Sequence, residues 1–258
     1  MSAVSRVLVV VPAHDEEAVL GQCLQQVATA AGAVRPAATV RTVVVLDHCS
    51  DRSASVAARH DVEVVECHAR NVGRARALGV AAAARDVLDD AATWVATTDA
   101  DSRVGPSWLL DHLAAAAAGY DALLGRVHPD PADLLPAVLR EWHRRHPRIG
   151  HHVHGANLGV RLAAYRAVGG FRALASGEDV ALVRALRDAG APVASGGTPV
   201  VSSGRSRARA PDGFAAYLRA LAHEVAPAES PDADSVALRP VGYPRPVARP
   251  VTVDDGRP

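Results

Sequence analysis

The sequence contains no lysine: all 28 of its basic residues are arginine, and they balance 28 acidic residues to a formal net charge of zero. The absence of lysine excludes a phosphate-loop lysine, a Schiff-base lysine for pyridoxal phosphate and a lysine general base. A neutral chain also lacks the basic excess that nucleic-acid binding normally needs, so we expect no nucleic-acid partner. A coding sequence rich in G and C is the simplest explanation for most of the arginines.

Cysteine and long apolar runs are also scarce. The three cysteines Cys23, Cys49 and Cys67 are an odd number without metal-ligand spacing, which predicts free thiols in a reducing compartment. The first apolar run, at residues 7–11, is too short for a signal-peptide core or a membrane span. We therefore expect a cytoplasmic protein without a transmembrane segment, either free or peripheral to the inner face of the membrane.

The first half of the chain alternates between short apolar runs and segments with helical spacing. Continuous apolar runs cover residues 7–11 and 43–46, shorter and mostly apolar runs cover 62–65 and 94–98, and helical spacing covers 16–31, 53–59, 73–88 and 107–118. Continuous apolar runs are typical of parallel strands that are covered on both faces. The alternation predicts βαβ units in a doubly wound α/β sheet, with Asp15, Ser50 and Pro106 marking helix starts.

The second half has a looser rhythm. We expect strands at 121–127, 156–161 and 200–203, and helices at 131–146, 178–189 and 212–224. Residues 226–258 are rich in proline, arginine and aspartate and show no period, which predicts a disordered tail. The chain is therefore expected to hold a single domain over 1–225 followed by that tail.

Acidic residues follow three of the predicted strands. They are Asp15, Glu16 and Glu17 after the first, Asp47 and Asp51 after the second, and Asp99 and Asp101 after the fourth. Ligands of an open parallel sheet bind beyond the carboxyl ends of its strands, so these loops mark the expected site. None of the three loops contains a Gly-x-Gly-x-x-Gly turn, which argues against a dinucleotide-binding dehydrogenase.

The acidic loops also have structural interpretations. Glu16 and Glu17 could stabilise the positive end of a helix dipole, and Asp47 and Asp51 could cap a helix. The pair Asp99 and Asp101 is harder to explain in this way, because two carboxylates so close together repel each other unless a cation neutralises them. Oxygen ligands of this type suit Mg²⁺ or Mn²⁺, with substrate phosphates completing the coordination shell.

Several segments together resemble a known family. They are the strand and loop at 9–17, the loop 47–53 (Asp-His-Cys-Ser-Asp-Arg-Ser), the segment 71–77 (Asn-Val-Gly-Arg-Ala-Arg-Ala), the D-x-D motif at 99–101, Gly155-Ala156-Asn157, Gly169-Gly170-Phe171 and Glu178-Asp179. Over roughly residues 5–222 the chain resembles the family-2 glycosyltransferases of the GT-A fold. One departure is His48, which stands where a second Asp or a Gly is usual.

The resemblance implies a role for each matched position on the donor side. The nucleotide would rest on Pro12, Ala13, Glu16 and Asp47. Asp99 would lie near the ribose or the metal, and Asp101 would hold the metal, Mn²⁺ or Mg²⁺. The donor would be a UDP-, GDP- or TDP-linked sugar.

On the acceptor side, the resemblance implies that Asp179 is the general base and that Glu178 contacts the acceptor. The acceptor would be a small molecule or lipid-linked. A cation that neutralises the leaving diphosphate and a separate carboxylate that deprotonates the attacking hydroxyl are what sugar transfer needs. Direct displacement from the face opposite the leaving group would invert the anomeric centre.

Because lysine is absent, any permanently charged side chain that binds the donor phosphates must be an arginine. We name Arg74, Arg76 and Arg205 as the first candidates; Arg205 belongs to an arginine-rich stretch at 205–209 that could equally be a solvated basic loop. Two other features stay open. Asn71 and Asn157, the only asparagines, could serve as turn or cap residues, and the histidines at 143–154 fit no common zinc spacing, so we place them in the acceptor-side wall.

These observations predict a metal-dependent, inverting glycosyltransferase. A retaining GT-A transferase or a nucleotidyltransferase is the first alternative, although nucleotidyltransferases normally use a glycine-rich loop and a lysine on phosphate. The alternative from another class is a non-catalytic sugar-nucleotide-binding protein. Such a protein would have no chemical need for Asp99, Asp101 and Asp179 together.

Overall fold

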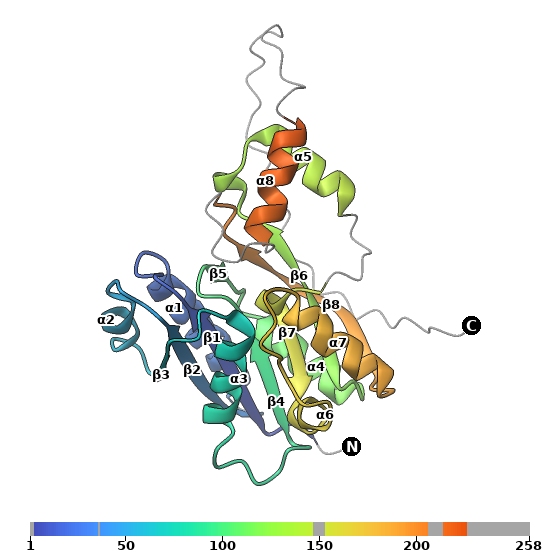
Figure 1. The fold of residues 1–258 in the computed structure, drawn as a ribbon. Helices are drawn as coiled ribbons and strands as arrows, with labels where there is room; N and C mark the ends of the chain where they lie inside the picture. The colour runs from blue at the N-terminus through green and yellow to red at the C-terminus, as the bar shows by residue number, and fades with distance from the viewer. Residues whose placement is uncertain (1–2, 36, 147–152, 206–213, 226–258) are drawn as a thin grey trace, which may run out of the picture.

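The computed structural model describes residues 3–35, 37–146, 153–205 and 214–225. The predicted tail at 226–258 lies outside these residues, as do His151, His152, Arg207 and Arg209. The described residues form one eight-stranded sheet with helices on both faces (Figure 1). This arrangement confirms the α/β architecture that was predicted from the sequence.

The sheet is mixed but mostly parallel, as predicted. Its strand order is β3-β2-β1-β4-β7-β6-β8-β5. The first four strands, β3 (Glu63–Cys67), β2 (Thr39–Asp47), β1 (Arg6–Ala13) and β4 (Thr93–Thr97), run parallel to one another. The next strand, β7 (Leu158–Arg161), runs antiparallel to β4 and to β6 (Ala122–Pro129). Beyond β6, β8 (Val193–Ser202) pairs in parallel with it, and β5 (Ser102–Arg103) closes the edge antiparallel to β8.

The two faces of β1 explain why its apolar run is continuous. Val7, Val9 and Val11 belong to one core, which also contains residues of α1 (Leu20–Val34) and α4 (Trp108–Ala117). Leu8 and Val10 belong to a second core on the opposite face, with residues of α3 (Val72–Ala83), α6 (Leu162–Ala167) and α7 (Glu178–Asp188). Both faces of the strand are therefore buried, as is typical of parallel strands under helices.

Several helix boundaries in the first half differ from the predicted ones. α1 begins at Leu20 with Val19 as its N-cap residue, so the prediction that Asp15 starts this helix is wrong. α2 (Ser53–Ala57) follows Arg52 rather than Ser50, and α3 ends five residues earlier than residue 88, at Ala83. The position of Pro106 near the start of α4 agrees with the prediction, because Ser107 is the N-cap residue.

In the second half, proline divides the helix predicted at 131–146. The segment splits into a short 3-10 helix, η1 (Pro131–Asp133), and α5 (Pro136–Arg145). Leu135, the residue before Pro136, is extended with φ −63° and ψ 143°, the conformation that a following proline favours. The strand predicted at 200–203 is the end of the longer β8, and the strand predicted at 156–161 is a 3-10 turn, η2 (Gly155–Asn157), followed by β7. Neither β5 nor α6 was predicted.

The last described helix, α8 (Phe214–Val225), packs against α5 at one end of the sheet (Figure 1). Their shared apolar cluster consists of Val138, Trp142, Leu218 and Leu221. This pair of helices thus has a small core of its own, separate from the two cores that cover the sheet. None of the helices in the described part of the chain combines the length and apolar character needed to cross a membrane.

Gly79 on α3 lies so close to the sheet that a larger residue would collide with it. A Cβ atom at this position would lie 2.4 Å from Val10 Cγ1 and 2.8 Å from Val45 Cγ2. We predict that Gly79→Ala lowers the free energy of unfolding by about 1–3 kcal/mol, measured by urea denaturation. Gly32→Ala on α1 is the matched control, since its Cβ would meet nothing within 4 Å. It should stabilise the protein by about 0.5–1 kcal/mol, and equal effects of the two changes would contradict the packing argument.

His112 on α4 is a fully buried titratable group in the core. Its Nδ1 accepts a hydrogen bond from Trp94 Nε1 at 3.2 Å, and burial lowers the pKa of the imidazole from 6.5 to about 3. Below about pH 6.5 the unfolded chain therefore takes up a proton that the folded chain does not. The free energy of unfolding should fall with decreasing pH by up to about 1.4 kcal/mol per pH unit from this residue.

We predict that His112→Gln, which keeps an acceptor for Trp94, removes this contribution. Urea unfolding followed from neutral pH to about pH 4 should show a shallower loss of stability for the variant than for the natural protein. Parallel pH curves for the two proteins would show that His112 does not titrate as its burial implies.

Candidate active site

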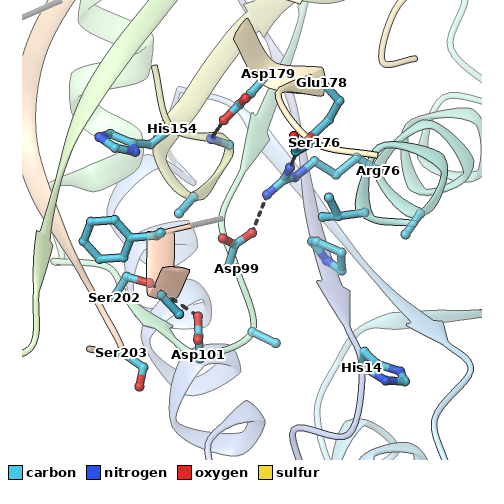
Figure 2. Close-up of a pocket in the computed structure, with 18 of the residues that line it drawn as sticks. His14, Arg76, Asp99, Asp101, His154, Ser176, Glu178, Asp179, Ser202 and Ser203 are labelled. Carbon is cyan, nitrogen blue, oxygen red and sulfur yellow. Dashed lines mark hydrogen bonds and ion pairs between the residues drawn. The ribbon is translucent and has the colours of Figure 1, made fainter. Parts of the chain in front are cut away.

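A large pocket opens where the strands of the parallel half of the sheet end. It encloses about 1110 Å³. Ten of the residues that the sequence analysis assigned to the site line it: Pro12, Ala13, Glu16, Asp47, Arg76, Asp99, Asp101, Glu178, Asp179 and Arg205. Figure 2 shows Asp99 near the middle, with Asp179 and His154 to one side, Asp101 and Ser202 to another, and His14 farther away. Residues far apart in the sequence are thus gathered in one cavity.

Asp47, at the end of β2, is a buried carboxylate that organises the turn before α3. Its two oxygens accept the backbone N–H groups of Arg70 and Asn71, each at 2.8 Å. Asp47 therefore does not cap the neighbouring helix α2. Asn71 caps α3 instead: its side chain accepts the N–H of Arg74 at 2.8 Å and donates to the carbonyl of Leu174 at 2.7 Å. The cap interpretation of Asn71 is confirmed.

Two histidines lie beside Asp47 at this end of the pocket. His14 Nδ1 lies 2.7 Å from the backbone carbonyl of Asp47, and because a carbonyl oxygen only accepts, Nδ1 carries the proton. His48 accepts a hydrogen bond from Arg70 through Nε2, since a guanidinium only donates. The two imidazole rings are stacked with centroids 6.3 Å apart. His48, the residue that departs from the family pattern, thus stacks on the imidazole ring of His14.

Asp15 and Asp51 tie the loops after β1 and β2 together. Asp15 has a left-handed backbone (φ 53°) and accepts the N–H groups of Ser50 at 2.7 Å and Asp51 at 3.2 Å. The hydrogen bond from Ser50 is the main cause that holds the pKa of Asp15 below its usual value. Asp51 in turn accepts the N–H of Glu17 at 2.8 Å. These carboxylates satisfy backbone donors and fix the loops.

Arg76 is a buried cation between two carboxylates. Its guanidinium donates to Asp99 Oδ1 at 2.5 Å and to Glu178, and its side chain is only 4% exposed (Figure 2). Burial alone would lower the pKa of the guanidinium, but Asp99 and the other nearby carboxylates outweigh it and raise that pKa. Burial likewise raises the pKa of the Glu178 carboxyl, an effect that Arg76 opposes. Arg76 thus links the end of β4 to the start of α7.

Close packing holds the Arg76 guanidinium in place. A Cβ atom on Gly155 would lie 2.4 Å from its Cζ, so only glycine fits there. The Phe171 ring lies on another side, with its centroid 5.9 Å from Cζ. The family motifs around Gly155 and Phe171 therefore have a shared physical role, which is to enclose this arginine.

Arg205, just after β8, stands beside the second aspartate of the D-x-D motif. It donates to Asp101 Oδ2 at 3.0 Å and forms a bidentate pair with the buried carboxylate of Glu16. Ser202, a residue that the sequence did not single out, places its hydroxyl 3.4 Å from Asp101 Oδ1. Glu16 therefore forms an ion pair with Arg205, 189 positions later in the sequence, instead of stabilising the positive end of a helix dipole.

Asp179 lies on the first turn of α7, at the other side of the pocket. Its Oδ2 accepts the N–H of Gly155 at 2.7 Å, and its Oδ1 accepts the N–H of Val180 at 2.8 Å. Backbone donors orient this carboxylate, whereas the neighbouring Glu178 is paired with Arg76. The adjacent carboxylates of Glu178 and Asp179 are therefore held in different ways.

Three residues that the sequence singled out do not line the pocket. Arg74 is exposed on α3 and is absent from the lining of the pocket. Asn157 ends the 3-10 turn η2, and its buried side chain is in addition a cross-link that accepts from Trp108 Nε1 at 2.9 Å and donates to the carbonyl of Arg126 at 2.9 Å. His143 is exposed, whereas His146 and His154 of the same histidine-rich segment line the pocket.

The donor atoms at the D-x-D motif fit a divalent cation. Asp101 offers carboxylate oxygens inside the pocket, and the Arg205 guanidinium beside it shows that a positive charge is accommodated at this point. Within the described residues, the only cluster of three side chains with converging ligand atoms is Asp15, Cys49 and Asp51. A cation at Asp101 would therefore need further ligands from outside the protein, as Mg²⁺ commonly takes from substrate phosphates.

Comparison with known proteins decides the family. The model of the family described as "Glycosyl transferase family 2" matches residues 8–168, more than half of the chain. The chain belongs to glycosyl transferase family 2. The match covers the acidic loops, the D-x-D motif and the turn that encloses Arg76. No curated protein matches this family-2 chain in sequence.

Solved structures show the same fold. TarS residues 1–349 from S. aureus superpose with a TM-score of 0.56 at 16% identity, over 85% of this chain and 65% of that one. Mannosyltransferase PcManGT from Pyrobaculum calidifontis, in complex with GDP-Man and Mn²⁺, gives a TM-score of 0.59 at 18% identity, over 80% and 59%.

A third similar structure is glucosyl-3-phosphoglycerate synthase from Mycobacterium tuberculosis, in complex with Mn²⁺, UDP and phosphoglyceric acid. Its TM-score is 0.56 at 15% identity, over 86% of this chain and 76% of that one. At such identities the likeness shows the fold alone, and it confirms the predicted GT-A type. The chain spans 65% and 59% of the lengths of the TarS fragment and PcManGT.

The buried position of Arg76 leads to a stability prediction. Arg76→Met would leave the Glu178 carboxylate buried without its partner, which typically costs about 3–5 kcal/mol of unfolding free energy. Arg74→Met, a matched change on the exposed face of the same helix, should stay within about 0.5 kcal/mol of the natural protein. Urea denaturation measures both.

The double variant Arg76→Met with Glu178→Gln removes the charge that the first change strands. It should recover part of the lost stability, so that the two changes are not additive. Additive losses would show that Arg76 and Glu178 are not coupled.

Proposed function

We propose that the chain transfers a sugar from a nucleoside-diphosphate donor to an acceptor hydroxyl, with Asp179 as the general base and with inversion at the anomeric carbon. One observation carries the proposal. Three carboxylates from distant segments, Asp99 and Asp101 after β4 and Asp179 on α7, line the same pocket. Family membership supports the reaction class, and the arrangement of these carboxylates supports their division of labour.

On the donor side, Asp101 and Asp99 would hold Mn²⁺ or Mg²⁺ together with the donor diphosphate. A divalent cation in this position neutralises the negative charge that grows on the leaving diphosphate. PcManGT in complex with GDP-Man and Mn²⁺ and glucosyl-3-phosphoglycerate synthase in complex with Mn²⁺ and UDP each hold a nucleotide together with a divalent cation, which supports a metal-dependent donor site in this chain. Pro12, Ala13 and Asp47, at the end of the pocket with the two histidines, would receive the nucleotide base.

Two of the arginines that line the pocket, Arg76 and Arg205, would have different roles. Arg205 lies at the pocket surface with a side chain 31% exposed, so it can contact the diphosphate while Glu16 holds it in place. Arg76 is buried, and both terminal nitrogens of its guanidinium are bonded to carboxylates. We therefore assign it to positioning Asp99 and Glu178 rather than to binding the phosphates. This assignment revises the role that the sequence had suggested for Arg76.

On the acceptor side, Asp179 would take the proton of the attacking hydroxyl. Two backbone N–H groups orient its carboxylate, and each oxygen keeps a lone pair for that proton. Attack from this side, across the pocket from Asp101, would displace the diphosphate from the opposite face of the sugar and invert the centre. Glu178 would act indirectly, by holding α7 to Arg76.

The alternatives make different demands on the same residues. A retaining transferase would release the product with the donor's anomeric configuration, which nuclear magnetic resonance of the product distinguishes. A nucleotidyltransferase would transfer the nucleoside monophosphoryl group and release pyrophosphate or a sugar phosphate instead of a nucleoside diphosphate. A non-catalytic binding protein would bind the donor but release nothing. A thermal-shift screen of UDP-, GDP- and TDP-sugars with Mn²⁺ identifies the donor for each of these tests.

We predict that Asp179→Asn lowers the rate of sugar transfer by about 10²–10⁴-fold, the usual contribution of a general base. Binding of the donor with Mn²⁺, measured by calorimetry, should change by less than about twofold, because Asp179 lies away from Asp101. Asp188→Asn at the exposed end of the same helix is the matched control and should leave the transfer rate unchanged. Full activity in Asp179→Asn would refute the base assignment.

Asp101→Asn should give the opposite pattern. Its Mn²⁺-dependent donor affinity should fall more than about tenfold, since a neutral amide is a far weaker ligand for the cation than a carboxylate. Donor binding without added metal should change much less. If Mn²⁺ strengthens donor binding equally in the variant and the natural protein, Asp101 is not the metal ligand.

A further inference from the structure

Part of the pocket wall on the side of Asp179 is apolar, and its residues come from three segments that are distant in the sequence. Val153 precedes η2, Val180 follows Asp179 on α7, and Phe214, Ala215 and Tyr217 lie at the start of α8. Val180 is 53% exposed. Apolar side chains from all three segments thus line the same pocket as the Asp179 carboxylate.

Aromatic and imidazole rings make this wall rigid. His154 meets Phe214 edge to face with centroids 5.9 Å apart, and His146 meets Tyr217 in the same way at 5.3 Å. His146 is in turn stacked on Trp142, at 4.7 Å and 9°. Trp142 belongs to the apolar cluster between α5 and α8, against which Phe214 and Tyr217 also pack. The wall is therefore preformed by the folding of these two helices.

The cations of the described lining are committed to other groups. Arg145, the arginine nearest these rings in sequence, is bonded to Glu141 at 2.6 Å and to Glu224 at 2.5 Å. Arg76 is bonded to Asp99 and Glu178, Arg205 to Glu16 and Asp101, and Arg70 to His48. An anionic group placed beside Asp179 would lose its hydration next to that carboxylate, and among the described lining residues no uncommitted arginine on this side would compensate.

From this wall we infer that the acceptor presents its hydroxyl on an uncharged, apolar body, an alkyl or aromatic alcohol, and not on a phosphorylated acid or a free sugar. This inference rests on the proposed function, because it assumes that Asp179 is where the acceptor hydroxyl reacts. Burial of the acceptor's apolar surface against Val180, Phe214 and Tyr217 supplies the binding free energy. The reacting hydroxyl is then the one polar group that must reach the carboxylate.

The test is a competition among acceptors, with the full chain, Mn²⁺ and the donor found by thermal shift. The panel contains 1-octanol, 2-naphthol, glucose and phosphoglyceric acid, and both product formation and release of nucleoside diphosphate are followed. We expect kcat/KM for at least one of the two alcohols to exceed that for glucose and phosphoglyceric acid by about tenfold or more. The ratio between 1-octanol and 2-naphthol tells an alkyl acceptor from an aromatic one.

The other outcomes separate the two proposals. Preferred transfer to glucose or phosphoglyceric acid overturns the inference and leaves sugar transfer intact. Donor cleavage whose rate neither alcohol increases also overturns the inference about the acceptor. Absence of any diphosphate release from every donor overturns the proposed function itself.

Two variants test whether the wall carries the preference. Phe214→Ala and Val180→Ser should each raise KM for the preferred alcohol by about three- to tenfold, with a smaller change in kcat. Val180 is exposed, so its replacement keeps the test valid even if Phe214→Ala perturbs α8. Leu110→Ser, at a 45% exposed position on α4 away from the pocket, is the control and should leave KM unchanged. Unchanged KM values in both wall variants would overturn the inference.

Discussion

The buried arginine at position 76 is the interaction on which the site depends. It joins Asp99, at the end of a central strand, to Glu178, which lies 102 residues beyond Arg76 on α7. A planar guanidinium can serve two carboxylates at once, and in a chain without lysine it is the only permanent cation available. Without it, two buried or half-buried negative charges would repel each other where the two halves of the domain meet. Gly155 and Phe171 are then constrained by the space that this side chain occupies.

The same constraint explains how a neutral chain contains a strongly acidic cavity. Each carboxylate of the D-x-D motif is paired with an arginine, Asp99 with Arg76 and Asp101 with Arg205, although the two arginines are far apart in the sequence. The two pairs differ in burial, with Arg76 4% and Arg205 31% exposed, and that difference separates a fixed counter-ion from one within reach of a ligand. The negative charge of the D-x-D motif is therefore balanced locally, by arginines inside the same pocket.

The sequence predicted what depends on local pattern. Continuous apolar runs predicted β1 and β2, mostly apolar runs predicted β3 and β4, and the acidic residues after β1, β2 and β4 predicted the location of the pocket. The start of α1 was misjudged because Asp15 bonds to Ser50 and Asp51 on another loop instead of to its own helix. The burial of Arg76 and the pairing of Glu16 with Arg205 could not be predicted from the sequence either. Both depend on contacts between residues more than 100 positions apart, which leave no trace in local spacing.

The aromatic rings gather at one end of the pocket, so its two ends differ in polarity. Phenylalanine, tryptophan and tyrosine make up only 3% of the chain, yet Phe214 and Tyr217 stand at the pocket and Trp142 supports them from behind. The opposite end holds ion pairs and backbone-bonded carboxylates. A charged nucleotide and an apolar alcohol would each be poorly bound at the other's end, so under the proposed function the wall and the carboxylates would together orient both substrates. In that arrangement Asp179 would lie between the two environments, where the hydroxyl of an otherwise apolar acceptor would lose its proton.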